Sequence, residues 1–508
     1  MVRLFQKFKS YFKPKKIIAS TLECFKMVDY GDFVLRDSYL LLQTGLDKMV
    51  RSLRGRVNNN ESVNVWKYFA NTRRMLQARY PATLTRVNPT SFDLILQKGI
   101  FPYEYFNSLS KLDERSLPSQ KFFHSSLTEQ DITTADYQHA QQVWRQFKCT
   151  DLSDYSNLYV QSDVSLLMDC MTNTRMMLYE VYALDMAHFI SLPSFAMNCA
   201  LKTVKQPLDL IKDEEMLKLW DDGMFGGISL VDTAQFKANN PEMDSSTINA
   251  TLGPKGSRKI GENTHQLYDE SQETKSIHSL DCNALYGWAM TMPLPTGDFR
   301  WEDPNIITPD LIAQYSDDDE RGYLMKVHLK YPQKLHATHD SFPCAPNHMS
   351  VPMEDLSSFQ QDYLRTNNME NVVQFEKLIP NLHDKKDYVL HMKNLQQYIK
   401  LGLILDGVVS VVSFKQSRWL AKYINLNTQL RQANHDDPVA VLFYKLLSNI
   451  VFGKFIEDPT KYRTIKLVQT EEEFDALVSQ IEFDFAKMVD NNAAIIEMKM
   501  GASRYAVV

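Results

Sequence analysis

Apolar residues recur every three or four positions through two segments in the second quarter of the chain. These segments are 134–150 and 155–185, and the second contains YVQSDVSLLMDCMTNTRMMLYEVY. A spacing near 3.6 places such residues on one face, so both segments are predicted to be helices. Further upstream, FVLRDSYLLL (33–42) is predicted to be a strand and GLDKMVRSL (45–53) an amphipathic helix.

The downstream half predicts elements of both kinds. Two strands and two helices are expected there, at 278–300, 322–332, 416–433 and 439–455. Asp437 and Pro438 suit the N-cap and the first position of the last helix. Because strands and helices alternate irregularly, the fold class is predicted to be mixed α/β.

Composition and charge limit the classes of protein that fit. The chain has 508 residues, 44% of them apolar, which is enough for two to four domains with real cores. Lys and Arg total 56 and Asp and Glu total 62, so the net charge is −6. This balance excludes a simple polycation that coats nucleic acid, but it leaves room for a local basic groove. The segment 235–275 is polar and is predicted to be a surface loop or insertion.

Cysteine usage and hydropathy bear on the compartment. The six cysteines are scattered without a CxxC pair, at Cys24, Cys149, Cys170, Cys199, Cys282 and Cys344. This pattern favours reduced thiols in an intracellular protein and gives no support for a zinc site. The segment 402–414 is the longest apolar candidate for a membrane span, and it is short and broken by Asp406. The basic, aromatic N-terminus lacks the features of a secretory signal and is interpreted as a surface helix, with a DNA-contacting or sorting role as the alternative.

Candidate chemistry begins at SLDCNALYGWAM (279–290). Asp281 is predicted to end a short strand and is followed at once by Leu285 and Tyr286 in a tight turn. A single aspartate at such a place is also typical of an ordinary turn or cap. The segment alone therefore does not separate a metal ligand from a structural residue.

A second candidate is the stripe in YKLLSNIVFGK (444–454). Lys445, Asn449 and Phe452 stand at i, i+4 and i+7, and on a helix they share one face. Gly453 beside that face permits close approach of another molecule. A lysine, an amide and an aromatic ring suit an anionic ligand with a flat ring, such as a nucleoside triphosphate. The alternative is an amphipathic helix whose lysine extends its stem along apolar surface.

Together these two segments resemble family B DNA polymerases, most closely the protein-primed type of viruses and self-synthesising DNA transposons. LDCNALYGWAMTMPLPTG resembles motif A of that family, and KLLSNIVFGK resembles motif B, Lys-x-x-x-Asn-Ser-x-Tyr-Gly. The chain departs from motif B at Ile450, where Ser is usual, and at Phe452, where Tyr is usual. The second change keeps the ring and loses a hydroxyl, whereas the first changes the polarity of the nucleotide pocket.

Further segments resemble the family in its own order, so the resemblance covers roughly residues 20–508. YVQSDVSLL resembles the third exonuclease motif, with Tyr159 and Asp163 in place, and its alternative is a helix start capped by Ser162 or Asp163. FGGIS (225–229) resembles the link between exonuclease and polymerase. The remaining matching segments are 33–50, 98–114, 378–391 and 414–431.

The resemblance implies roles at the polymerase site. Asp281 and the carbonyl of Cys282 are expected to bind Mg²⁺ in a two-metal site that joins a deoxynucleotide to a primer. Tyr286 is expected to exclude a ribose 2′-hydroxyl. The other expected nucleotide contacts are Leu285, Arg431, Lys445, Asn449, Phe452 and Gly453.

The resemblance also implies roles outside the polymerase site. In the proofreading half, Asp163 is expected to bind metal and Tyr159 to orient the attacking water. Phe225, Gly226 and Gly227 are expected to contact template DNA. Implied partners are primer-template DNA, deoxynucleoside triphosphates and a terminal priming protein, with no membrane. The implied location is intracellular, in a nucleus or at a site of viral replication.

The predicted architecture is a right-hand polymerase, palm and fingers, with a partial RNase H-like 3′–5′ exonuclease domain. The expected divisions are exonuclease over 1–185, palm over 186–415 with motif A at 279–290, fingers over 416–456 with motif B at 445–454, and a returning palm segment over 457–508.

Some expected motifs have no match in the chain. Motif C, an Asp-Thr-Asp turn, has no match in 456–508, and the first two exonuclease motifs have none before residue 33. SDDDER (316–321) is interpreted as a solvated acidic loop. We therefore expect an internal segment of a longer polymerase, inactive unless motif C is supplied. The alternative is a non-catalytic, DNA-binding remnant of a viral or transposon polymerase.

Overall fold

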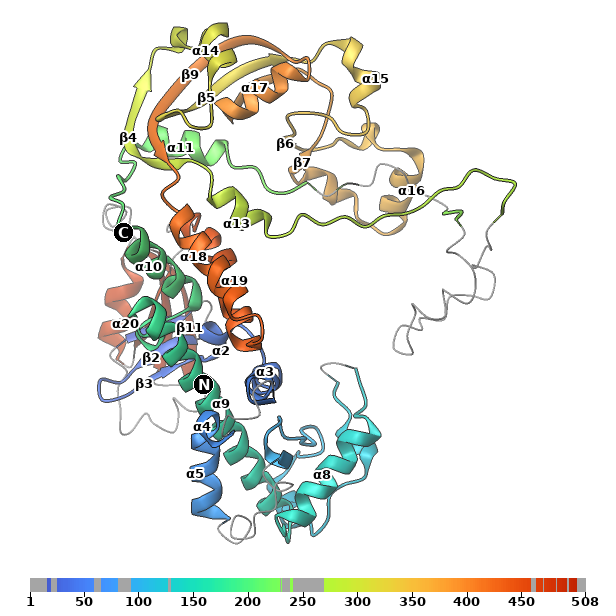
Figure 1. The fold of residues 1–508 in the computed structure, drawn as a ribbon, viewed down its shortest axis with the longest axis vertical. Coiled ribbons are helices and arrows are strands. Elements are labelled where there is room, and N and C mark those ends of the chain that lie inside the picture. Colours follow the sequence, from blue (N-terminus) through green and yellow to red (C-terminus); the bar gives the residue numbers. More distant parts are fainter. Residues whose placement is uncertain are drawn as a thin grey trace. The chain divides into compact units, whose positions relative to one another are not determined.

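A computed structural model gives the arrangement of the chain (Figure 1). It describes residues 16–19, 25–58, 65–80, 93–126, 129–228, 230, 238–240, 269–457, 463–468, 470–480, 482–490 and 493–499. The chain divides into two compact units. Unit 1 comprises 1–206, 286–291 and 418–508, and unit 2 comprises 207–285 and 292–417. Most of the polar segment predicted as a loop at 235–275 lies outside the described residues.

The longest helix of unit 1 is α9 (Leu152–Tyr182). Its N-cap is Asp151, whose side chain accepts a hydrogen bond from the Asp154 amide. The helix is continuous for 31 residues, so the alternative that it begins at Ser162 or Asp163 is wrong. Before it, α8 (Thr134–Gln146) is capped by Thr133 in the same way. Both helices predicted in this region are therefore confirmed.

The prediction for residues 33–42 is only partly right. The strand β3 covers Val34–Arg36, and the short helix α2 (Tyr39–Leu42) replaces the rest. The side chain of Asp37 accepts a hydrogen bond from the Tyr39 amide at 2.9 Å, which starts a helical turn where the strand was expected to continue. The predicted helix that follows is confirmed as α3 (Leu46–Asn58).

Unit 1 contains a six-stranded antiparallel sheet in the order β11-β12-β10-β1-β2-β3. The strands other than β3 are β1 (Lys16–Ala19), β2 (Phe25–Asp29), β10 (Arg463–Val468), β11 (Phe483–Asp490) and β12 (Ala493–Lys499). Helix α20 (Glu471–Val478) packs on it, with Phe474 and Leu477 against Ile496. One sheet therefore pairs β1, near the start of the chain, with β10, near its end. The predicted divisions place these two strands in the exonuclease and in the palm, and those divisions stay predictions.

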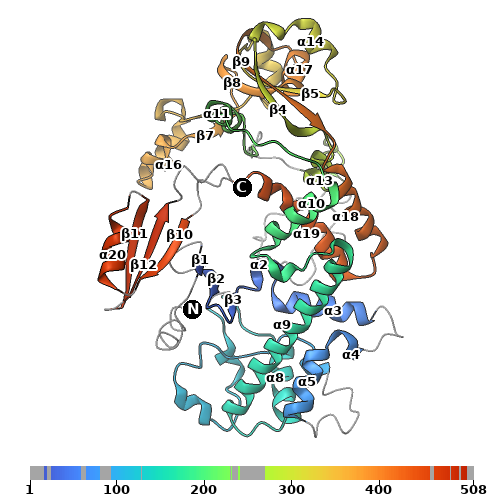
Figure 2. The same cartoon turned by 90° about the vertical axis from the view of Figure 1, so that its left-hand side faces the viewer.

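Three helices form the bundle that carries motif B: α10 (Leu192–Val204), α18 (Ala421–Ala433) and α19 (Pro438–Phe455) (Figure 2). The predicted cap of α19 is confirmed, because Asp437 accepts hydrogen bonds from the Val439 and Ala440 amides. The helix buries Phe443 and Leu447 within the bundle. The helix α19 is long and apolar enough to cross a membrane, but the core helices of soluble proteins often have the same length and composition. It differs from the candidate span predicted from the sequence, which is the shorter segment 402–414.

Unit 2 is built on a four-stranded antiparallel sheet in the order β4-β9-β5-β8. The strands are β4 (Leu294–Glu302), β5 (Arg321–Lys330), β8 (Lys385–His391) and β9 (Ile404–Ser417). Successive side chains alternate between faces. Met325 packs with Ile312 of α14 (Pro309–Gln314) and Leu395 of α17 (Met392–Lys400), whereas Leu324 packs with Leu219 of α11 (Glu214–Asp222).

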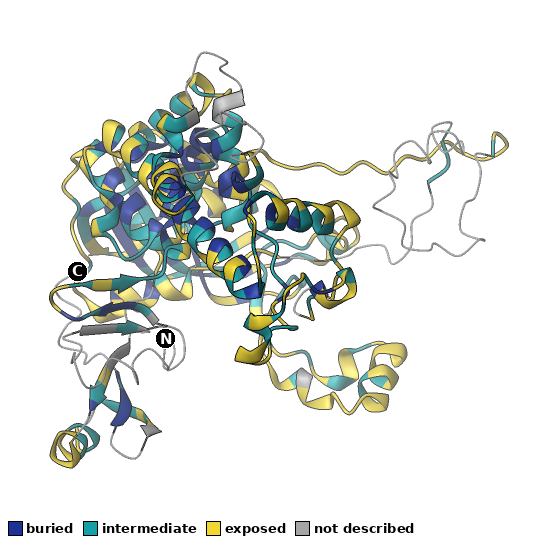
Figure 3. Cartoon of the chain, turned by 90° about the horizontal axis from the view of Figure 1, so that it is seen from below, coloured by how far each residue is buried: buried dark blue, intermediate teal, exposed yellow. Residues whose placement is uncertain are grey.

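The predicted strand at 322–332 is confirmed as β5, but the predicted strand at 278–300 is wrong over its first half. There the chain forms α13 (Leu285–Met290), and β4 begins only at Leu294. The remaining helices and strands are α4 (Val65–Tyr68), α5 (Ala70–Arg79), α15 (His336–His339), α16 (Ser358–Thr366), β6 (Asn347–Met349) and β7 (Lys377–Ile379). Figure 3 shows buried positions on the inner faces of helices and strands and exposed positions on their outer faces.

Candidate nucleotide-binding and exonuclease sites

Motif A and motif B meet in unit 1. The ring of Tyr286, on α13, lies 4.9 Å from the ring of Phe452, on α19, with an angle of 48° between their planes. Tyr286 stays 56% exposed, so the pair presents aromatic surface to solvent. Gly287 is buried, and a Cβ there would touch Ile424 of α18 at 3.6 Å. The short helix of motif A therefore packs against the helix pair that carries motif B.

The motif B residues lie along one side of α19. Lys445 is exposed, whereas Asn449 and Phe452 are half-buried. Gly453 is exposed and a Cβ there would meet nothing within 4 Å, so a ligand can approach the backbone at this point. A positive charge, an amide and a ring along one helix suit a phosphate-bearing ligand with a flat base.

The other two predicted nucleotide contacts are Arg431 and Leu285. Arg431 lies exposed in the last turn of α18, next to the loop that leads into α19. Leu285 is the first residue of α13 and is 54% exposed. The residue before it, Ala284, has φ of 54°, which is the left-handed region. The tight turn predicted after Asp281 is present, and it is followed by helix.

Asp281 does not end a strand. Asp281 and Cys282 are exposed and lie in an irregular segment of unit 2 just before this turn. Leu280, in the same segment, is 92% exposed. The expectation of a rigid strand end at Asp281 is corrected, because no neighbouring strand pairs with 278–284 in the described part of the chain.

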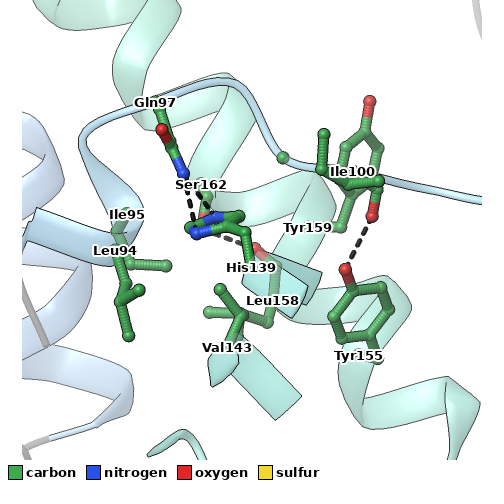
Figure 4. A pocket seen from close by; sticks show the side chains of 11 residues that line it. Leu94, Ile95, Gln97, Ile100, His139, Val143, Tyr155, Leu158, Tyr159 and Ser162 are labelled. Atoms are coloured by element: carbon green, nitrogen blue, oxygen red, sulfur yellow. Dashed lines mark hydrogen bonds between the residues drawn. The ribbon is translucent and has the colours of Figure 1, made fainter. Parts of the chain in front are cut away.

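Tyr159 and Asp163 lie one turn apart on α9 and both face the loop 97–103 (Figure 4 shows Tyr159 with its neighbours). The Gly99 amide donates to Asp163 Oδ1 at 3.4 Å, and the hydroxyls of Tyr103 and Tyr159 form a hydrogen bond. Phe101 stacks on the Tyr159 ring with centroids 5.0 Å apart. The loop thus fixes both side chains of the predicted exonuclease pair.

Burial changes the acidity of this pair. Loss of solvent raises the pKa of the Asp163 carboxyl, although hydrogen bonds from Tyr159 and the Gly99 amide and the charge of Lys98 oppose the change. Loss of solvent, together with the hydrogen bonds to Tyr103 and Asp163, also raises the pKa of the Tyr159 hydroxyl. Tyr159 therefore stays protonated at neutral pH and can donate a hydrogen bond.

A small cavity of about 20 Å³ lies beside the pair, between the loop and helices α8 and α9 (Figure 4). Gln97 Nε2 lies 2.7 Å from a ring nitrogen of His139 at its polar end. A Cβ on Gly99 would come within 2.5 Å of the Tyr159 ring, so only glycine fits there. Sequence patterns pointed to the segment 98–114 but predicted no role for Gly99 or Tyr103. The glycine and the aromatic residues of that segment were the available signal.

Asp169, the next acid toward the C-terminal end of α9, has a structural role. It is buried and accepts hydrogen bonds from the backbone amides and side chains of Asn71 and Thr72, at 2.7–2.9 Å. These residues begin α5, so Asp169 satisfies donors at a helix N-terminus. Its oxygens are occupied by protein donors.

The predicted template-contacting segment belongs to unit 2. Phe225 stacks on Tyr388 with centroids 5.2 Å apart and planes 10° apart, and it lies 6.1 Å from His348. Gly226 and Gly227 are exposed, with nothing within 4 Å of an added Cβ. The phenylalanine anchors the segment to the sheet domain and leaves the two glycines open to a ligand.

The described residues do not complete a metal site. Among them, no three His, Cys, Asp or Glu side chains come together in a way that could hold a metal ion. Asp281 and Asp163 each stand as single carboxylates, and a two-metal centre needs more oxygen ligands than one carboxylate supplies. The described thiols are free, with Cys282 exposed.

Comparison with known proteins identifies the family to which the chain belongs. The family model described as DNA polymerase type B, organellar and viral, matches residues 1–500. The chain therefore belongs to this family of type B DNA polymerases. A search of curated protein sequences finds no match.

Several solved structures of phi29 DNA polymerase are similar to the chain. The orthorhombic crystal form is 11% identical with a TM-score of 0.40, and the match covers 90% of this chain and 56% of that one. The ternary complex with primer-template DNA and incoming nucleotides is 12% identical with a TM-score of 0.43, covering 90% and 55%. The complex with single-stranded DNA is 12% identical with a TM-score of 0.41, covering 92% and 59%. The chain thus spans little more than half the length of these polymerases.

Proposed function

We propose that the chain is the palm, fingers and partial exonuclease portion of a DNA-directed DNA polymerase that adds deoxynucleotides to a primer. Membership of the type B family supports this, and the contact of Tyr286 with Phe452 carries it. In this proposal the aromatic pair lies under the sugar and base of the incoming nucleotide, and the exposed ammonium of Lys445 faces its triphosphate. Electrostatic stabilisation of the leaving phosphates is the largest contribution expected from such a residue.

Mg²⁺ is the proposed cofactor of the complete protein. Within this chain Asp281 and the Cys282 carbonyl would be its ligands, and a second carboxylate has to come from elsewhere. The metal would supply charge stabilisation for the transferred phosphoryl group.

The remaining partners are also proposals. Primer-template DNA would contact Phe225, Gly226 and Gly227, and the exposed glycines leave the backbone open for this. Tyr159 and Asp163 would act on a primer 3′ end in a remnant 3′–5′ exonuclease. A terminal protein that supplies the priming hydroxyl is proposed from the family resemblance alone.

A second candidate function is DNA binding without turnover. The single carboxylate at the motif A site favours it, because one aspartate does not hold two divalent ions. This candidate predicts salt-sensitive binding to primer-template DNA. Failure to bind at low salt would count against both candidates.

The experiment that separates them is primer extension with Mg²⁺ by the chain alone and by a version extended to include motif C. Extension that depends on Asp281 in the longer version supports the polymerase. Tight, salt-sensitive binding without extension in either version supports the binding remnant.

A further inference from the structure

Three buried polar side chains lie inside the apolar helix bundle of unit 1. Tyr182, at the end of α9, is 5% exposed, and Tyr423 and Asn427, on α18, are fully buried. Apolar residues surround them, including Phe195 of α10, whose ring lies 6.2 Å from that of Tyr182, and the fully buried Leu447 of α19. Polar groups in such a place need a specific reason, because burial is unfavourable unless each finds a partner.

The three side chains link three helices in a line. Tyr182 Oη donates to Asn427 Oδ1 at 2.5 Å, which joins α9 to α18. Asn427 Nδ2 donates to the Tyr423 carbonyl at 3.2 Å, within α18. Tyr423 Oη donates to the Leu447 carbonyl at 3.2 Å, which joins α18 to α19. The line therefore runs from the helix of Tyr159 and Asp163 to the helix of motif B.

The protonation states suit this arrangement. Burial raises the pKa of both the Tyr182 and the Tyr423 hydroxyls. Both groups therefore remain protonated at neutral pH and act as donors. The Tyr423 carbonyl can only accept, so Asn427 turns its Nδ2 toward it and leaves Oδ1 as the acceptor for Tyr182. The Leu447 carbonyl can likewise only accept, which fixes the Tyr423 hydroxyl as its donor.

Only one axial position of α19 satisfies the Tyr423 hydroxyl. The rise per residue of a helix is about 1.5 Å, so a slip of one residue would remove the Leu447 carbonyl from hydrogen-bond reach. An unpaired buried group costs more than a paired one gains, so the line disfavours slipped packings. A buried asparagine in a coiled coil sets register in the same way.

We propose that Tyr182, Asn427 and Tyr423 are positioning residues that fix the register of α19 against α18 and α9. The Leu447 carbonyl lies in sequence between Lys445 and Asn449, so this register sets where the motif B side chains stand. The consequence for nucleotide binding rests on the proposed function, whereas the claim about register does not.

The test replaces paired polar groups together with apolar groups of similar shape, which is the change least harmful to folding. The variants are the double change Tyr182→Phe with Asn427→Leu and the single change Tyr423→Phe, each in the full chain. The matched control is Tyr137→Phe, which removes a tyrosine hydroxyl that donates to the Pro118 carbonyl at 3.0 Å, away from α18 and α19. Backbone hydrogen exchange is followed in α19 and α8, together with dATP binding in the presence of primer-template DNA.

We expect exchange within α19 to rise about tenfold in both test variants and dATP binding to weaken about tenfold, with exchange in α8 unchanged. The control should leave α19 and dATP binding as in the wild type. A structural role alone would change exchange throughout the unit in proportion to stability. If the double variant unfolds, Tyr423→Phe carries the same test.

The outcomes separate the inference from the proposed function. Unchanged exchange within α19 overturns the register claim whatever happens to nucleotide binding. Faster exchange in α19 with unchanged dATP binding overturns the link from register to the nucleotide. Faster exchange in α19 when the wild type binds no dATP supports the register claim and counts against the proposed function instead.

Discussion

The two candidate sites of unit 1 differ in how their side chains are held. At the motif B site Lys445 is exposed, and the Tyr286–Phe452 pair presents its rings to solvent. At the exonuclease site Tyr159 and Asp163 are held by Tyr103 and the Gly99 amide. One site is a solvent-exposed helix surface, whereas at the other a loop holds two side chains in place. Spacing within one helix aligns Lys445, Asn449 and Phe452 at the first site, whereas contacts with a loop distant in sequence hold the two side chains of the second.

The largest expected effect is on catalysis and comes from a substitution at Asp281. Unlike the side chains of both candidate sites, Asp281 lies exposed in an irregular segment. In a polymerase that includes motif C, Asp281→Ala should lower primer extension by about 10³-fold or more, since it removes the carboxylate that is proposed to bind Mg²⁺. The measurement is single-turnover extension of a labelled primer with Mg²⁺. Extension at the wild-type rate would remove Asp281 from the site.

Tyr286 tests whether the aromatic pair meets the sugar. In the same extended protein, Tyr286→Val should relax discrimination between deoxy- and ribonucleotides by about 10- to 100-fold, because the ring no longer fills the space of a 2′-hydroxyl. The readout is the ratio of kcat/KM for dATP and ATP. An unchanged ratio with unchanged activity would show that the pair does not contact the sugar.

A substitution at Gly99 tests whether the loop 97–103 holds the Tyr159 side chain in place. Gly99→Ala places a Cβ 2.5 Å from the Tyr159 ring and should lower the free energy of unfolding by about 1–3 kcal/mol through overpacking. Gly226→Ala, where an added Cβ meets nothing within 4 Å and the backbone belongs to no helix or strand, serves as the control and should change it by less than about 0.5 kcal/mol. Urea unfolding of the full chain measures both. Equal effects of the two changes would mean that the loop does not hold Tyr159.

The smallest effect concerns the charge of Asp163. Burial raises the pKa of its carboxyl in the folded protein. Between the ordinary aspartate pKa and this raised pKa, the folded state binds more protons than the unfolded state. The free energy of unfolding therefore falls as the pH rises between these two values. Asp163→Asn should therefore be more stable than the wild type at pH 7, and the difference should shrink as pH falls below the ordinary aspartate pKa. Unfolding free energies measured from pH 3 to pH 7 test this. A variant less stable at pH 7 would show that its hydrogen bonds outweigh the cost of burial.

Sequence patterns predicted the parts of the fold that depend on near neighbours. The spacing along α9 and α19 and the cap at Asp437 were correct, because helix periodicity and capping act over a few residues. The strand at Asp281 was wrong, because a turn at Ala284 leads into a helix and no partner strand is present in the described segment.

Other features depend on distant contacts and gave no local signal. The pairing of β1 with β10 joins residues more than 400 positions apart, and register between such segments is set by tertiary packing. The contacts of Gly99 and Tyr103 with α9 join residues 56–64 positions apart. Motif spacing predicted side chains for the nucleotide site, which stay predictions, and it did not show what holds the candidate exonuclease pair in place.

The most direct test of the central claim is binding of dATP to the full chain with primer-template DNA, compared among the wild type, Lys445→Ala and Lys422→Ala. Both lysines are exposed, one on α19 about two turns before Phe452 and the other on α18 outside the motif B stripe. The account predicts that Lys445→Ala weakens binding by about tenfold or more and that Lys422→Ala leaves it unchanged. Equal affinities in all three proteins would contradict a nucleotide site on the motif B helix.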